Sequence, residues 1–363
     1  MIKNRNKPRL ELFSHRIIDW QQRHGRHGLP WQGTDVYHVW LSEIMLQQTQ
    51  VATVIPYYHR FVARFPTIAA LAADSEDAVL AHWSGLGYYS RARNLHRTAQ
   101  LIMQRHEGKF PKHFEDILAL PGIGRSTAAA ISALAFHERC AILDGNVKRV
   151  LARYHAIEGY TGEKKIEAQL WQQAEALLPK RDVAVYTQGL MDLGALICTR
   201  SKPQCAICPL QADCAAYQNE RITQLPTPRP RKVLPEKHST FLLLLNDSDI
   251  LLTKRPGSGI WGSLWCPPQV DPKVLSTATD PSTYCLQHFG TETIHSLALS
   301  TFTHTFTHFK LHITPILLQV INKPKQTQES GMVWLDVNDA LRAAIPTPVR
   351  KLLLEIQAGR KSL

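Results

Sequence analysis

The segment FEDILALPGIGRSTA occupies residues 114–128 and lies between two stretches with helical apolar spacing. Within it, Leu120-Pro-Gly-Ile-Gly124 predicts a tight hairpin, because Gly122 and Gly124 reach backbone conformations that other residues avoid. Without side chains, both glycines let backbone N–H groups approach an anion, and the dipole of a helix starting at Arg125 favours the same charge. Such a hairpin grips phosphate without reading sequence. An ordinary Pro-Gly turn between packed helices is the alternative.

The chain changes character once outside this hairpin. From about residue 10 to 215, apolar residues recur mostly at helical spacing. This spacing is clear at Tyr37, Leu41, Ile44 and Met45. Four prolines and several positive charges then mark an extended linker. Strand-like stretches follow at 241–245, 250–253 and 301–313, and an amphipathic helix is expected over 339–356. We predict an all-α region over 1–220, a linker over 221–238 and an α+β domain over 239–363.

Length and charge limit the classes of protein to consider. The 363 residues, 44% hydrophobic, suffice for two or three domains with cores of their own. The longest apolar run, 241–245, is too short to cross a bilayer, and the basic first ten residues lack the apolar stretch of a secretory signal. We therefore expect a soluble intracellular protein. The net charge of +12 favours a polyanionic partner such as nucleic acid, although it also serves solubility.

Four of the seven cysteines crowd into seventeen residues. Their spacing is C-x6-C-x2-C-x5-C, formed by Cys198, Cys205, Cys208 and Cys214. Thiolates this close can surround one metal centre, and sulfur ligands suit zinc or an iron–sulfur cluster. Structural zinc sites usually leave about two to four residues between paired ligands, which only the middle gap satisfies, so the cluster is favoured. No chemistry is assigned to Cys140, Cys266 and Cys285.

These features together resemble one enzyme family. The cysteine spacing is similar to the [4Fe–4S] loop of the endonuclease III and MutY DNA glycosylases, and the hairpin to their helix–hairpin–helix motif. Residues 41–51 (LSEIMLQQTQV) and 142–150 (ILDGNVKRV) resemble signature segments of the MutY-type adenine DNA glycosylases. The resemblance implies one cluster per chain, held by the four cysteines away from the chemistry, in a loop whose Arg200 and Lys202 face DNA.

Two carboxylates carry the chemistry that the resemblance implies. Excising a purine requires a proton donor for the base and a negative group beneath the sugar, which becomes cationic. Glu43 shares a helical face with Trp40 and Gln47, where apolar neighbours would raise its pKa. Asp144 precedes a helical run and two basic residues, which would lower its pKa. A solvated glutamate and a plain helix cap are the alternatives.

The resemblance assigns a role to each carboxylate. It makes Glu43 the acid that protonates adenine N7, and Asp144 the group that stabilises the oxocarbenium ion through a covalent acetal with net retention. Asn146 would position groups around Asp144.

A stacked adenine must leave the duplex before it can react. By the same resemblance, Gln48 and Tyr88 insert beside the mispair and Trp31 lines the adenine pocket. Val36 departs from the proline that is typical of the family, and the segment before Tyr37 is one residue short. The expected DNA-binding set is Gln47, Gln48, Tyr88, Gly122, Gly124, Ser126, Lys148, Phe306, Thr307 and His308.

The C-terminal region resembles a Nudix fold over 241–268. A hydrolytic Nudix site needs a carboxylate-rich helix to hold magnesium, and the acids between residues 239 and 300 are scattered, so we expect no pyrophosphatase activity. Residues 306–308 match instead the family's Phe-Ser-His loop, which contacts 8-oxoguanine opposite adenine. Thr307 keeps the hydroxyl of the usual serine and adds a methyl group.

We therefore expect a monofunctional adenine DNA glycosylase of base excision repair, acting on double-stranded DNA with adenine opposite 8-oxoguanine or guanine. It would be a monomer in the cytoplasm of a bacterium, associated with the nucleoid. Its fold class would be multidomain, with an all-α helix–hairpin–helix core carrying the [4Fe–4S] loop and a C-terminal α+β Nudix-like domain.

The sequence leaves two alternative functions. An endonuclease III-like bifunctional glycosylase with lyase activity needs a lysine two positions after the second glycine, where this chain has Ser126. A serine cannot form a Schiff base with the sugar. A non-enzymatic iron–sulfur module that binds DNA is the third reading, and the matched positions of Glu43 and Asp144 argue against it.

Overall fold

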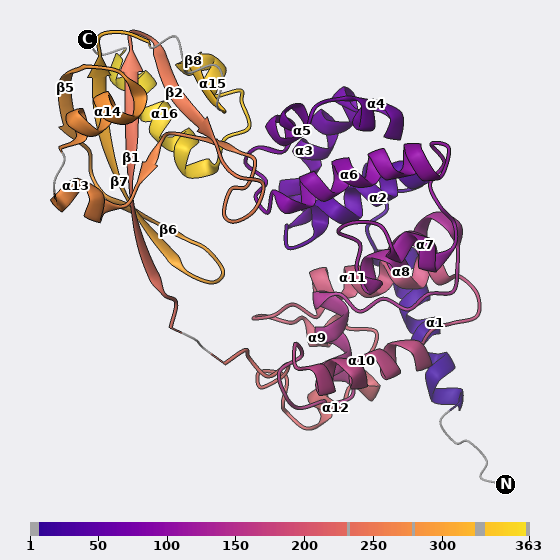
Figure 1. Cartoon of the computed structure of the whole chain (residues 1–363). Helices are drawn as coiled ribbons and strands as arrows, with labels where there is room; N and C mark the ends of the chain where they lie inside the picture. The colour runs from indigo at the N-terminus through magenta and orange to yellow at the C-terminus, as the bar shows by residue number, and fades with distance from the viewer. Residues whose placement is uncertain (1–6, 231–232, 278–279, 324–330, 361–363) are drawn as a thin grey trace. The chain divides into compact units, whose positions relative to one another are not determined.

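The computed structural model describes residues 7–230, 233–277, 280–323 and 331–360. Residues 1–6 of the basic start and 231–232 of the expected linker lie outside these ranges. The chain folds as two compact units, coloured by residue number in Figure 1. The first comprises residues 1–72 and 97–231, and the second comprises 73–96 and 232–363. The region expected to be all-α thus contributes one segment to the second unit.

The first unit is built from helices. They are α1 (Lys7–His24), α2 (Val36–Leu46), α3 (Val51–Arg64), α4 (Ile68–Ala73), α6 (Ser90–Arg105), α7 (Phe114–Leu118), α8 (Arg125–Phe136), α9 (Gly145–Tyr154), α10 (Lys164–Ala176), α11 (Val183–Asp192) and α12 (Ala215–Gln218). α4 and α6 continue into the second unit. A buried core joins α1, α8, α9, α10 and α11, and includes Phe13, Ile17, Leu151 and Leu190. The helix predicted from the apolar spacing of residues 37–45 is confirmed as α2, and the helix expected to start at Arg125 is confirmed as α8.

The predicted hairpin joins α7 to α8. Gly122 has a φ of +76°, in the left-handed region that favours glycine. Gly124 is the extended N-cap of α8, which begins at Arg125 as expected. Leu120 and Ile123 are buried beneath the turn, and the backbone N–H of Ile123 donates to the Leu120 carbonyl at 3.2 Å. The hairpin is therefore anchored by its apolar residues while its glycines stay uncovered.

The second unit is a mixed sheet flanked by helices (Figure 1). Its described strands are β1 (Glu236–Asn246), β2 (Asp249–Lys254), β3 (Trp265–Cys266), β4 (Gln269–Val270), β5 (Thr293–Ala298), β6 (Phe302–Thr305), β7 (Lys310–Val320) and β8 (Met332–Asp336). The main order is β3-β2-β1-β7-β5, with β1 and β7 parallel and the other pairs antiparallel. Its helices are α5 (Glu76–Trp83), α13 (Pro272–Thr277), α14 (Pro281–Phe289), α15 (Val337–Ala340) and α16 (Thr347–Arg360).

The leucines of β1 place this strand in the buried centre of the sheet. β1 is buried from Thr240 to Leu245, and alternate residues Leu242 and Leu244 join a core with Leu318 of β7 and Cys285 of α14. A strand covered on both faces reads as a continuous apolar run, which is why residues 241–245 lack alternation. β6 and the start of β7 form a hairpin that projects from the sheet (Figure 1).

Two boundaries differ from the sequence prediction. The single helix expected over 339–356 is two helices, α15 and α16, with Pro346 between them, because proline lacks the N–H that helix continuation needs. The expected linker is not extended throughout, since residues 222–224 form a turn in which the Gln224 N–H donates to the Arg221 carbonyl at 3.1 Å. Its start is also held by hydrogen bonds, from Arg153 Nε to the Leu225 carbonyl at 2.8 Å and from the Gly159 N–H to Thr227 Oγ1 at 3.0 Å. Among the described residues, no helix is both long and apolar enough to span a bilayer.

Candidate active site and cysteine loop

Glu43 lies on α2 in a setting that favours its protonated form. Asp35 caps this helix by accepting from the His38 N–H at 3.1 Å, and the neighbours Ser42 and Ile44 are buried. The Glu43 side chain is only partly accessible. Burial raises its pKa to about 7, and the negative charge of Asp144 adds to the effect. The expectation of a raised pKa is confirmed, and the two carboxyls lie within electrostatic range of each other.

Asp144 is the N-cap of α9, as the sequence predicts. Its Oδ1 accepts from the Val147 N–H at 2.7 Å, and its Oδ2 accepts from Asn146 Nδ2 at 3.4 Å. The expectation of a lowered pKa is wrong. Burial raises the pKa of Asp144, and this outweighs the lowering by the two hydrogen bonds and the charge of Arg149.

The first turn of α8 connects the two carboxylate-bearing segments. Ser126 Oγ accepts from the Leu143 N–H at 3.0 Å, directly before Asp144. From the other side, Gln47 Nε2, at the end of α2, donates to Thr127 Oγ1 at 3.3 Å and to the Gly122 carbonyl at 3.4 Å. The hairpin and the first turn of α8 are thus hydrogen-bonded to residues close in sequence to both acids: Leu143 precedes Asp144, and Gln47 follows Glu43 by four positions. The Ser126 hydroxyl is therefore engaged in a structural hydrogen bond with the Leu143 N–H.

The two basic residues after Asp144 have separate partners. Lys148 Nζ forms an ion pair with Glu167 of α10 at 2.6 Å. Arg149 Nη2 donates to Asn146 Oδ1 at 2.8 Å and to the Gly194 carbonyl at 2.7 Å, while its Nε donates to the Cys198 carbonyl at 2.7 Å. Arg149 therefore joins the start of α9 to the beginning of the cysteine loop.

The two residues expected to insert beside the mispair, Gln48 and Tyr88, have unusual backbone conformations. Gln48 has a φ of 58° and Tyr88 a φ of 49°, and neither is a glycine. Left-handed conformations of this kind cost energy and cluster at functional sites. Gln48 is exposed in the first unit, and the Tyr88 side chain, in the second, is 46% exposed. Each residue is thus presented outward within its own unit.

Trp31 lies in the loop between α1 and α2. It is buried, and its ring meets that of Tyr58 edge-on with the centroids 5.2 Å apart. This loop is anchored by a residue that sequence reasoning missed. Asp192 is fully buried and accepts from Arg26 Nε at 2.7 Å, from the Arg26 backbone N–H at 2.8 Å and from Gln188 Nε2 at 2.8 Å. The one available signal was an acid inside an apolar helical run.

The expected 8-oxoguanine loop is the turn between β6 and β7. Phe306 stacks on Phe309 with centroids 4.6 Å apart, and its N–H donates to the Phe309 carbonyl at 2.9 Å. Trp261 also contacts the Phe306 ring, at 5.3 Å. Thr307 and His308 are exposed at the tip. The turn is therefore anchored by the packed ring of Phe306, and its two polar side chains, Thr307 and His308, point into solvent.

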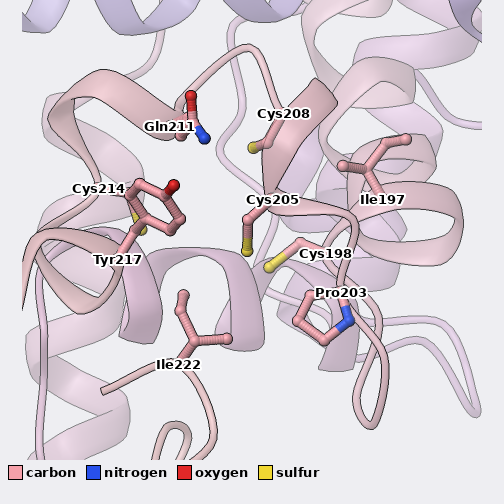
Figure 2. Close-up of a pocket in the computed structure, with 9 residues that line it drawn as sticks. All are labelled: Ile197, Cys198, Pro203, Cys205, Cys208, Gln211, Cys214, Tyr217 and Ile222. Carbon is pink, nitrogen blue, oxygen red and sulfur yellow. The ribbon is translucent and has the colours of Figure 1, made fainter. Parts of the chain in front are cut away.

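The four clustered cysteines line one pocket with Ile197, Pro203, Gln211, Tyr217 and Ile222, and Figure 2 shows the thiols of Cys198 and Cys205 side by side. Burial raises the pKa of the Cys208 thiol to about 12 and also raises that of Cys214. All seven cysteines are described, and none forms a disulfide.

The lining of this pocket bears on whether it could hold the implied cluster. Within the described ranges, no three His, Cys, Asp or Glu side chains stand as a preformed site for a single ion. Four thiols line one pocket, and thiolates are the ligands of iron–sulfur clusters, so the chemistry of these side chains fits the implied cluster. Buried Arg153 donates to Cys198 Sγ at 3.4 Å and to the Thr199 carbonyl at 2.7 Å, which braces the loop.

Comparison with known proteins places the chain. It is 40% identical to the adenine DNA glycosylase of Buchnera aphidicola subsp. Schizaphis graminum, over 94% of this chain and 98% of that protein. It is 31% identical to the adenine DNA glycosylase of Homo sapiens, over 96% of this chain and 74% of that protein. The chain belongs to the adenine DNA glycosylase family. Residues 41–176 also match the model of the HhH-GPD superfamily of base excision DNA repair proteins.

The remaining comparisons agree with the two expected folds. Residues 240–355 match the NUDIX domain model, which confirms the Nudix-like prediction. A solved thermostable thymine-DNA glycosylase superposes with a TM-score of 0.54 and 28% identity, over 59% of this chain and 99% of that one. An endonuclease III–DNA complex shares the helical fold at a TM-score of 0.51 and 19% identity, over 61% of this chain and 99% of that one.

Proposed function

We propose that the chain is a monofunctional adenine DNA glycosylase, which hydrolyses the N-glycosidic bond of adenine opposite 8-oxoguanine or guanine in duplex DNA. One observation carries the proposal: Glu43, with a pKa of about 7, lies within electrostatic range of Asp144. Family membership supports adenine as the base. The pair of acids supplies a mechanism for its removal.

The two carboxyls take different parts in the reaction. Glu43 holds a proton near neutral pH and donates it to adenine N7, so that the base leaves as a neutral molecule when the C1′–N9 bond breaks. Asp144, as a carboxylate, stabilises the positive charge on the deoxyribose and closes on C1′ to form an acetal. Water then attacks C1′ and releases Asp144, and ionised Glu43 takes the proton of that water.

Two acids are needed because one is insufficient. A general acid alone contributes about 10²–10⁴ in rate, while enzymes commonly reach about 10⁶ or more. Burial raises the pKa of both carboxyls, and the negative charge of Asp144 raises that of Glu43 further. The hydrogen bonds from Val147 and Asn146 favour the charged form of Asp144. These contacts support the assignment of acid to Glu43 and anion to Asp144.

The remaining expected residues would hold and distort DNA. The hairpin at Gly122 and Gly124 would bind backbone phosphate through N–H groups. Gln48 and Tyr88, both exposed on strained backbones, would occupy the space left by the extruded adenine. The polar tip formed by Thr307 and His308 would contact 8-oxoguanine.

The four cysteines would hold a [4Fe–4S] cluster, which supplies structural cross-linking of the loop when bound. Arg153 and Arg149 fix the Cys198 end of this loop through the contacts described above. The exposed residues Arg200 and Lys202 would then face the DNA backbone from a rigid support. No step of excision is assigned to the cluster.

Strand cleavage is excluded from the proposal because of Ser126. A lyase needs an amine that forms a Schiff base with the opened sugar. At this position the chain has a hydroxyl that already accepts from the Leu143 N–H at 3.0 Å. We expect purified protein to excise adenine from an 8-oxoguanine:adenine duplex, with breaks appearing only after alkali. Nicking without alkali at the rate of excision would contradict the monofunctional assignment.

A pair of matched variants tests the role of Asp144. Asp144→Asn should abolish excision while leaving duplex binding largely intact, because the amide cannot stabilise a cation. Asp280→Asn is the control, since Asp280 also caps a helix and accepts from the Ser282 N–H at 2.8 Å. The control should excise normally. An active Asp144→Asn enzyme would remove this residue from the mechanism.

A further inference from the structure

The turn between α5 and α6 concentrates backbone strain. Gly85, Gly87 and Tyr88 have φ values of +100°, +76° and +49°. For Tyr88 this conformation is costly, since its Cβ crowds the backbone. Such a residue keeps a strained conformation only when its surroundings determine it. The neighbours that fix Tyr88 therefore decide where its exposed ring points.

Arg91 is the neighbour that makes several contacts with the turn containing Tyr88. Its side chain is buried, with 7% of the residue exposed. Nη2 donates to the Gly87 carbonyl at 3.1 Å and to the Leu86 carbonyl at 3.4 Å, and the Arg91 N–H donates to the Tyr88 carbonyl at 2.9 Å. Trp83 Nε1 also donates to the Gly87 carbonyl, at 3.1 Å. The strained turn is thus bonded at three successive carbonyls.

The same guanidinium packs against two rings. Its central carbon lies 5.4 Å from the centre of the Tyr88 ring and 5.3 Å from that of Trp83. Burial lowers the pKa of Arg91 to about 10, so it remains a cation at neutral pH and attracts both ring faces. Lysine keeps the charge but lacks the planar guanidinium that stacks on the Tyr88 and Trp83 rings while its Nη2 bonds the carbonyls.

We propose that Arg91 is a positioning residue for base extrusion, which fixes the ring of Tyr88 in the outward orientation from which it enters the DNA. This inference rests on the proposed function and adds a residue that does not itself touch the substrate. Because Arg91 holds the Tyr88 ring in place before DNA binds, little conformational entropy of this side chain is lost when adenine leaves the stack. Loss of Arg91 should slow extrusion more than it weakens binding.

A double-mutant cycle tests this proposal. Arg91→Lys and Arg91→Met are made in the wild-type chain and in a Tyr88→Ala chain, and single-turnover excision is measured on a duplex with adenine opposite 8-oxoguanine. We expect Arg91→Lys to slow excision about 10- to 100-fold, the usual effect of losing hydrogen bonds from a charged group. In the Tyr88→Ala chain the same change should cost less than about twofold, because contacting residues couple.

A second readout separates positioning from general damage. Fluorescence of 2-aminopurine next to 8-oxoguanine rises when neighbouring bases unstack, and Arg91→Lys should reduce this rise while duplex affinity stays within about threefold. The control is Arg97→Lys, an exposed position on the same helix, which should leave both signals unchanged. Melting temperatures show whether each variant folds, and the cycle cancels any uniform loss of stability.

The outcomes distinguish this inference from the proposed function. A wild-type chain that excises no adenine would overturn the function itself. If the wild type is active, equal slowing by Arg91→Lys with and without Tyr88 would overturn the positioning role. Unchanged excision in Arg91→Lys and Arg91→Met would overturn it too.

Discussion

Glu43 should destabilise the fold at neutral pH. A carboxyl whose pKa is about 7 when folded, against an ordinary 4.5, keeps its proton in the folded chain over a range where the unfolded chain has lost it. The folded state therefore binds more protons between pH 4.5 and 7, and its stability falls as pH rises through this window. The difference corresponds to about 3 kcal/mol at most. Replacing Glu43 by glutamine removes the titration and should restore that stability.

The measurement is thermal unfolding of the wild type and Glu43→Gln from pH 4.5 to 8. For a unit of this size, about 3 kcal/mol corresponds to roughly 6–12 °C in melting temperature. The variant should gain little at pH 4.5 and approach its full advantage at pH 8. Glu115→Gln, at an exposed position on α7, is the control and should shift the melting temperature little at any pH.

A Glu43→Gln variant whose melting temperature matches the wild type at both ends of this range would show that Glu43 does not destabilise the fold. A constant gain at all pH values would show that the gain reflects packing and not ionisation. Excision by Glu43→Gln should fall about 10²–10⁴-fold, because the amide has no proton to donate. A more stable but inactive variant would mark Glu43 as a site where stability is sacrificed for chemistry.

Three other residues give sharp predictions. Ser126→Lys should lose the bond to the Leu143 N–H but place an amine near the sugar, so borohydride should trap a covalent DNA adduct that the wild type does not form. Arg153→Gln should loosen the cysteine loop, and iron per chain should fall relative to the wild type if the cluster is present. Thr307→Ser should change the preference for 8-oxoguanine over guanine by less than about tenfold, since the hydroxyl is kept. Duplex affinity should fall steeply with salt if phosphate contacts dominate, and a flat salt titration would contradict a phosphate-gripping hairpin.

Local patterns predicted most of the fold. Two glycines on either side of Ile123 predicted a tight turn, and the structure has the turn at Gly122 and the start of α8 directly after Gly124. The apolar run at 241–245 predicted a strand but not the strands that pair with it. The parallel pairing of β1 with β7 joins residues about seventy positions apart in the sequence, which no local pattern contains. Pro346 was visible, yet the apolar spacing around it suggested one helix, and the break followed from the missing N–H.

The candidate site was predictable in identity more than in electrostatics. Asp144 was expected near a helix N-terminus and is there, but the depth of its burial depends on how α8 and α9 pack, which no local pattern contains. The same limit applies to Asp192 and Arg91, whose roles depend on partners brought together by folding. Charged residues in apolar helical runs were the available hint, since burial of a charge requires compensation.

In the proposed mechanism, a proton on Glu43 drives departure of the base. Single-turnover excision of adenine opposite 8-oxoguanine, followed from pH 5 to 9, tests it most directly. For the wild type the rate should fall as pH rises, with a midpoint near 7, where Glu43 loses its proton. Glu43→Gln should be slow throughout and lack this fall. A wild-type rate that is unchanged between pH 6 and 9, or a Glu43→Gln rate equal to it, would show that Glu43 does not donate this proton.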